Sequence, residues 1–288
     1  STYYGGPGGF EMASQNDVPM AAKAHIIGTA FLGVQMKCAR CHDAPFHDVG
    51  QQDLFSLAAM LGRKPQGVPK TSTINLSEEA LKDLIVVVSL KPGQTAPVEW
   101  TFDELVSPDD VQHLLTENKD SREQLAALVT SSENERFRNV IVNRLWKRYL
   151  GRGLVEPVDD WEFADPSHPE LLKQLSDELV LSGYDLQAIS RLILNSKTYQ
   201  REAVAAAPLN DTDWFSFSGP LRRHLSAEQV VDTMFASAGK QLQAGQMNID
   251  VDGSRSYTTS LNLGRPHRAW MFTSSSNERD RPSLSLPL

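Results

Sequence analysis

Both cysteines of this 288-residue chain lie in one short stretch, CARCH, which covers residues 38–42. The spacing C-x-x-C-H is typical of covalent haem attachment, because the two thiols can reach the two vinyl groups of a porphyrin and the next residue supplies an imidazole for the iron. The sequence therefore predicts a haem c site. In that site Cys38 and Cys41 form the thioethers, and His42 is the proximal iron ligand.

The same stretch leaves three other interpretations open. Two thiols on a buried helix can be unreactive, and a C-x-x-C pair can form a structural or redox disulfide. Zinc is the third alternative, with ligands drawn from Cys38, Cys41, His42 and His47. Structural zinc normally takes four nitrogen or sulfur ligands, often from two separated cysteine pairs, and this sequence has no second pair.

The sixth iron ligand has three candidates. His47 lies shortly after His42, beyond Pro45, so it tends to stay on the same side of a bound ring. Met60 lies in the next predicted helix, off its apolar stripe, where methionine commonly fills core space. His168 directly follows a predicted N-cap serine, and a histidine there commonly bonds to its own neighbours. An iron with no sixth protein ligand is the remaining alternative.

Two further stretches carry ligand-type side chains. VDDWEFADP (residues 158–166) contains four carboxylates, which suit general acid–base chemistry, although an exposed acidic loop is the commoner explanation. NIDVDG (residues 248–253) resembles the start of a calcium loop, but the twelfth position is Thr259 instead of Glu. An Asp/Gly turn is therefore favoured there.

The charge balance limits the classes of partner. The chain has 28 Lys and Arg against 36 Asp and Glu, a formal net charge of −8, without a dense basic cluster. This balance argues against nucleic acid as a partner. No run of about 18 apolar residues occurs, so the sequence predicts no membrane span. The first residues, STYYGGPGGF, do not resemble a signal peptide.

Helical periodicity begins near residue 21 and runs into the motif. An apolar stripe predicts one amphipathic helix that carries both thiols on its apolar face. The residues at this spacing are Ile27, Phe31, Val34, Cys38 and Cys41. A second short helix is expected to end near Gly62.

The remaining chain divides into two parts. A loop and β connector is expected at 66–120, after a cytochrome-like segment at 1–65, and β-branched residues around a Pro-Gly turn predict a small β-hairpin or edge strands near 84–100. Residues 121–288 are expected to form a helical C-terminal domain. The predicted fold class is mainly α.

One helix of that domain is well marked, at residues 136–151. Its predicted end is Gly151, because glycine is the usual residue just after a helix. Its predicted apolar face consists of Phe137, Ile141, Leu145 and Tyr149.

Several longer stretches resemble a known family. FLGVQMKCARCHDAPFHDVGQQDLFSLAAM (residues 31–60) resembles the cytochrome-like domain of large planctomycete-type secreted proteins. Five other stretches resemble the partner domain of unknown function found downstream in the same proteins. They are NVIVNRLWKRYLGRGLVEPVDDW, PSHPELL, LILNSKTYQ, GRPHRAW and NERDRPSL.

The resemblance implies that Cys38, Cys41 and His42 correspond to the haem c motif of that family. Many relatives have His where this chain has Ala44, so a ligand at that position is not available here. The resemblance also implies an exported protein that occurs with secreted degradative proteins.

We therefore expect a secreted or periplasmic c-type haem protein that transfers electrons, with a redox partner protein and an association with polysaccharide or the cell envelope. The first alternative is a haem-dependent oxidative or peroxidase-like enzyme linked to polysaccharide breakdown. It needs an open iron position and a polar group beside it, such as His47 or His168. The second is a non-redox surface or binding protein whose motif holds zinc or nothing.

Overall fold

The computed structural model describes residues 18–45, 47–70, 79, 86–116, 120–205, 216–243, 247–250, 260–264 and 268. The chain forms two compact units, one of Met20–Arg222 and one of Ser1–Pro19 with Arg223–Leu288. The described residues are mainly helical, which confirms the predicted fold class. No helix among them is both long and apolar enough to span a bilayer.

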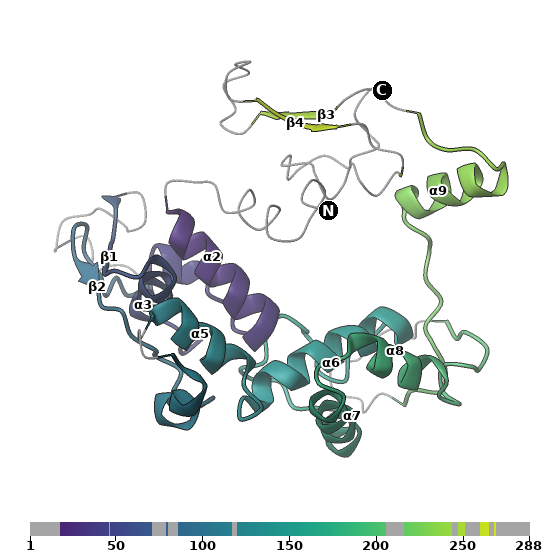
Figure 1. Ribbon diagram of the computed structural model, residues 1–288, viewed down its shortest axis with the longest axis horizontal. Helices are drawn as coiled ribbons and strands as arrows, with labels where there is room; N and C mark the ends of the chain where they lie inside the picture. Colours follow the sequence, from purple (N-terminus) through teal and green to yellow (C-terminus); the bar gives the residue numbers. More distant parts are fainter. Residues whose placement is uncertain are drawn as a thin grey trace. The chain divides into compact units, whose positions relative to one another are not determined.

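The larger unit contains helices throughout and one very small sheet (Figure 1). Its elements in chain order are α2 (Pro19–Ile27), η1 (Gly28–Leu32), η2 (Cys38–Arg40), α3 (Gln51–Gly62), β1 (Gln66–Gly67), β2 (Thr95–Ala96), η4 (Pro108–Leu114), α5 (Ser121–Thr130), α6 (Glu135–Leu150), α7 (Pro169–Leu181) and α8 (Leu186–Leu194). The smaller unit contains α9 (Ala227–Ser237) and an antiparallel pair, β3 (Met247–Asp250) and β4 (Ser260–Gly264).

The strand expected near residues 84–100 is present as β2, but its partner is β1 and not a neighbour within that range. Gln66 pairs with Ala96 in antiparallel register. Val68 then extends the contact, because its N–H donates to Gln94 O and its carbonyl accepts from the Gly93 N–H, both at 2.8 Å. Residues 80–85 lie outside the described residues.

The prediction that one continuous helix carries both thiols is wrong. α2 ends at Ile27, a π-helical turn (η1) follows, and the chain then leaves the helix at Gly33. Gly33 has φ +63°, and its N–H donates to the Gly28 carbonyl, as at a left-handed helix C-cap. The two cysteines therefore flank the separate 3₁₀ turn η2, which Cys38 begins and Cys41 caps, and Cys38 is exposed.

Gly33 also lies against Trp161, whose backbone N–H donates to the Gly33 carbonyl at 2.9 Å. A Cβ at Gly33 would lie 2.8 Å from Trp161 Cγ and closer still to Cδ1. A side chain also costs about 1–2 kcal/mol at this φ. We expect Gly33→Ala to lower the free energy of unfolding, measured with urea, by about 3 kcal/mol in total.

Gly183→Ala is the matched control for this prediction. Gly183 has φ +68°, and no described atom lies within 4 Å of the Cβ that alanine would add. Only the backbone strain should remain, at about 1–2 kcal/mol. Equal losses in the two variants would contradict the close contact between Gly33 and Trp161.

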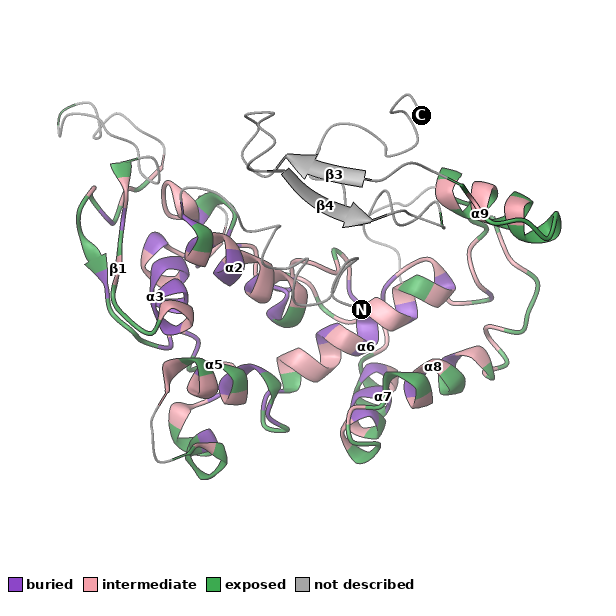
Figure 2. Ribbon diagram, turned by 45° about the horizontal axis from the view of Figure 1, so that its top comes forward, coloured by how far each residue is buried: buried purple, intermediate pink, exposed green. Residues whose placement is uncertain are grey.

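α3 and the three helices α6, α7 and α8 hold the main buried surfaces (Figure 2). In α3, Leu54, Phe55, Leu57 and Met60 are each at most 2% exposed. Around α6, the largest buried cluster consists of Val140, Val142, Trp146, Leu150, Leu154, Val155, Trp161, Leu172, Leu175, Leu179, Ile189 and Ile193.

α6 forms and ends at Gly151 as predicted, and its predicted apolar face lies at the edge of the buried face. The buried residues of α6 are Val140, Val142, Asn143, Trp146 and Leu150. Three members of the predicted face, Ile141, Leu145 and Tyr149, are only partly buried beside the cluster. Because the buried face contains the polar Asn143, the apolar pattern of the sequence predicted the neighbouring face instead.

Arg144 connects α6 to the chain that leads into the motif. Its guanidinium donates to the Thr29 carbonyl at 2.7 Å and to the Ala30 carbonyl at 3.0 Å, both in η1. The same guanidinium pairs with Asp159 at 2.6 Å, in the loop between α6 and α7. The fold thus holds the segment before the CARCH motif and the α6–α7 loop on one helix.

Candidate functional site

The CARCH motif forms a tight helical turn. The N–H groups of Cys41 and His42 both donate to the Cys38 carbonyl, at 3.0 and 3.2 Å. Both cysteines are free thiols, with Cys38 exposed and Cys41 intermediate in exposure. Ala39 between them is fully buried, so the turn is anchored by its middle while its thiols stay accessible.

Asp43 fixes this turn against its surroundings. Its carboxylate accepts the N–H of Gln51 at 2.7 Å, at the start of α3, and the hydroxyl of Ser89 at 2.6 Å. Its own N–H donates to the Val87 carbonyl at 2.8 Å, although the Val87 side chain is 65% exposed. The motif is therefore held by the start of α3 on one side and by residues 87–89 on the other. The largely exposed Val87 side chain lies in the second of these segments.

His42 is oriented by a backbone contact. Its Nδ1 lies 2.8 Å from the Asp43 carbonyl. A carbonyl can only accept, so Nδ1 is the donor in this contact and Nε2 is the nitrogen left to bind a metal. A backbone carbonyl on the second nitrogen is the usual support of a metal-binding histidine. Two accessible thiols on a helical turn and this imidazole fit the donor set of haem c.

The structure places two of the sixth-ligand candidates, Met60 and His168, in packed surroundings. Met60 is 1% exposed and lies nine positions after Gln51, about 14 Å along α3 from the end that Asp43 holds. His168 is the N-cap residue of α7, one position later than the predicted serine cap. Its Nδ1 lies 3.0 Å from the Ser167 hydroxyl, and its ring packs 5.4 Å from that of Phe217.

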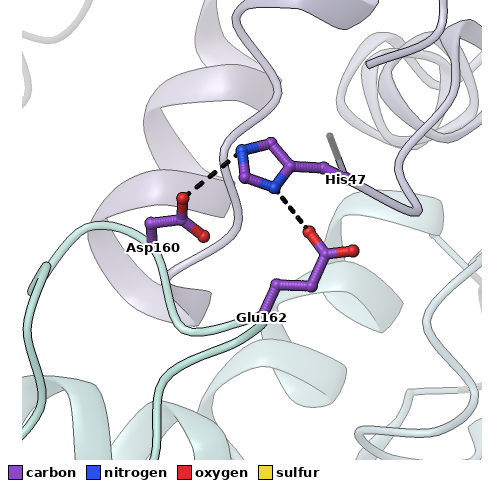
Figure 3. Close-up of side chains that lie close together, drawn as sticks. All are labelled: His47, Asp160 and Glu162. Atoms are coloured by element: carbon purple, nitrogen blue, oxygen red, sulfur yellow. Dashed lines mark ion pairs between the residues drawn. The ribbon is translucent and has the colours of Figure 1, made fainter. Parts of the chain in front are cut away.

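The third candidate, His47, contacts the acidic stretch VDDWEFADP (Figure 3). Its Nε2 lies 3.3 Å from Asp160 Oδ2, and its Nδ1 lies 2.9 Å from Glu162 Oε2. The other Glu162 oxygen accepts the Asp48 N–H. Of the same stretch, Asp159 pairs with Arg144 instead. The structure thus brings together a histidine and two carboxylates from segments far apart in the sequence.

A pocket of about 370 Å³ adjoins this cluster, and sequence reasoning did not find it. Its charged lining comes from Asp48, Asp53, Glu104, Arg136 and Glu162, while none of the three haem-motif residues lines it. Burial lowers the pKa of the Arg136 guanidinium, and the nearby carboxylates oppose that shift. The lining residues come from five separate segments, so no local pattern could have identified the pocket.

Half of the calcium-like stretch NIDVDG lies outside the described residues. Only residues 248–250 of it are described, as part of β3. Thr259 also lies outside them.

Two family models match the chain. Residues 8–65 match PSCyt2, described as a protein of unknown function (DUF1549), and residues 121–287 match PSD1, described as a protein of unknown function (DUF1553). Searches of curated proteins and of solved structures found no match. The two models are the planctomycete-type paired domains, in the order that the sequence stretches indicated. Because PSD1 covers more than half of the 288 residues, the chain belongs to the PSD1 (DUF1553) family, with a DUF1549 segment before it.

Proposed function

We propose that this protein is an exported c-type haem protein that transfers electrons. The observation that carries the proposal is the CARCH turn itself, where two free thiols stand beside an imidazole whose Nδ1 is bound to a backbone carbonyl. A bound haem supplies one-electron chemistry at its iron. Cys38 and Cys41 would hold it covalently, and His42 would be the proximal ligand.

The residues around the motif support a rigid attachment. Asp43 ties the turn to the start of α3 and to Ser89, and its carbonyl accepts from His42 Nδ1, which restrains the imidazole. The exposed thiol of Cys38 and the exposed side chain of Val87 favour a ring with one edge toward solvent. An exposed edge is what outer-sphere transfer to a redox partner protein requires.

Electron transfer is favoured over an oxidative enzyme by the positions of two histidines. A peroxidase-like site needs a polar group that faces the iron. His47 is bound to Asp160 and Glu162, and His168 is bound to Ser167 and packs on Phe217. Neither histidine is therefore free to act as the polar group that a peroxidase-like site needs opposite His42. Haem c is assembled outside the cytoplasm, so the proposal includes a periplasmic or extracellular location. It also includes an envelope or polysaccharide association, because the chain resembles secreted proteins that occur with degradative ones.

Intact-mass measurement tests the proposal. The chain is produced with an export signal in cells that mature c-type cytochromes, with a known c-type cytochrome made in parallel as the control. We expect an added mass of about 616 Da and a Soret band that survives denaturation. A low-spin ferric spectrum that does not change on addition of cyanide or peroxide supports electron transfer. A high-spin ferric spectrum that changes with both supports the alternative of an oxidative or peroxidase-like enzyme. A colourless chain at its bare peptide mass contradicts both.

A further inference from the structure

His47, Asp160 and Glu162 form a compact group of metal-type ligands (Figure 3). One ligand atom from each side chain lies within 4.8 Å of the other two. The three side chains are only 21–25% exposed, so they are partly shielded from water. His47 follows the CARCH turn, and the carboxylates belong to the loop between α6 and α7.

Ion pairing alone leaves this group incompletely satisfied. The Nδ1 atom of His47 is buried, and no described residue forms a hydrogen bond of good geometry with it, although Glu162 Oε2 lies 2.9 Å away. A neutral imidazole with two carboxylates carries two negative charges, and a protonated imidazole still leaves one. Arg136 is the nearby cation, but its charge is shared between Glu162 and Glu104.

We propose that His47, Asp160 and Glu162 bind a divalent transition-metal ion such as Mn²⁺. One imidazole nitrogen and two carboxylate oxygens suit an ion that accepts mixed ligands. Bonds of about 2.0–2.2 Å place two ligand atoms at most about 4.4 Å apart, so the group must contract slightly around the ion. Asp160 and Glu162 contact different nitrogens of the His47 ring, so one carboxylate must turn toward the nitrogen that binds the ion. Water completes the coordination.

The surroundings of the three ligands preorganise them. The Asp48 N–H holds one oxygen of Glu162, which leaves the other for the ion. The Phe163 ring stacks on the His47 ring at 6.1 Å and 17°, which restricts rotation of the imidazole. A bound ion would join the segment just after the haem motif to the α6–α7 loop. The proposal does not depend on haem, because it uses none of the residues of CARCH.

Mn²⁺ is the appropriate probe, because the thiolates of Cys38 and Cys41 favour softer ions such as Zn²⁺ and would obscure the result. The full chain is titrated with Mn²⁺ and followed by electron paramagnetic resonance. We expect one bound ion per chain, and a melting temperature that rises with Mn²⁺ concentration because the ion binds only the folded state. Glu162→Gln and Asp160→Asn should each weaken binding at least about tenfold.

Glu170→Gln is the control, because Glu170 is an exposed carboxylate at the start of α7, outside the group. Its affinity for Mn²⁺ should equal that of the unsubstituted chain. His47→Gln should behave as the carboxylate variants do. The proposal is overturned if the unsubstituted chain binds no Mn²⁺ at millimolar concentration, or if Glu170→Gln weakens binding as much as Glu162→Gln. In the first case the group is an ion pair only.

Discussion

The Cys38→Ser/Cys41→Ser variant should carry no covalently bound haem after export. Both thioethers need a thiol, and these are the only two cysteines in the chain. The mass of the denatured chain should fall by about 616 Da relative to the unsubstituted protein, apart from the small change of the substitutions. Cys41→Ser alone should leave at most one thioether, a weakly held pigment and a shifted pyridine haemochrome spectrum.

Met60→Leu is the control for this experiment. Met60 is 1% exposed within α3, and leucine conserves most of its volume, so the haem content and the absorption spectrum should be unchanged. A spectral change in Met60→Leu would instead make Met60 an iron ligand. An unchanged pyridine haemochrome spectrum in Cys41→Ser would refute the covalent attachment itself.

The sequence predicted the helical part of this fold where local chemistry marks the ends of an element. α6 begins after the N-cap Asn134, whose side chain accepts the Phe137 N–H at 3.0 Å, and it ends at Gly151 as predicted. The helix predicted from the apolar stripe through Phe31 and Cys38 is interrupted, because Gly33 takes a left-handed conformation against Trp161. That contact joins residues far apart in the chain, so the periodicity of a local segment cannot predict it.

The candidate site was predictable in its parts and not in their arrangement. The spacing of CARCH identified Cys38, Cys41 and His42 as a unit, because its chemistry is local. His47 and the stretch around Asp160 each drew attention alone, as a doubtful iron ligand and as an exposed acidic loop. Their contact depends on how the α6–α7 loop folds back, which is fixed partly by Arg144 binding η1 and Asp159 together.

Asn143 should be among the most costly residues of the fold to replace. It is fully buried in α6, its carbonyl oxygen accepts the N–H groups of Leu154 and Val155 at 2.6 and 3.1 Å, and its NH₂ donates to the Val155 carbonyl at 2.8 Å. Alanine would leave three buried backbone groups without a partner, so we expect Asn143→Ala to lower the free energy of unfolding in urea by about 4 kcal/mol.

Ser176→Ala separates this effect from the mere loss of a buried polar side chain. Ser176 is also fully buried, but its hydroxyl donates only to the Leu172 carbonyl within α7, at 2.8 Å. That carbonyl already accepts a helix hydrogen bond, so alanine should cost under about 1 kcal/mol. If the two variants lose similar stability, the amide of Asn143 does not hold the loop after α6. If Asn143→Ala lowers the free energy of unfolding by several kcal/mol more than Ser176→Ala, the Asn143 amide holds the chain that leads to Asp160 and Glu162.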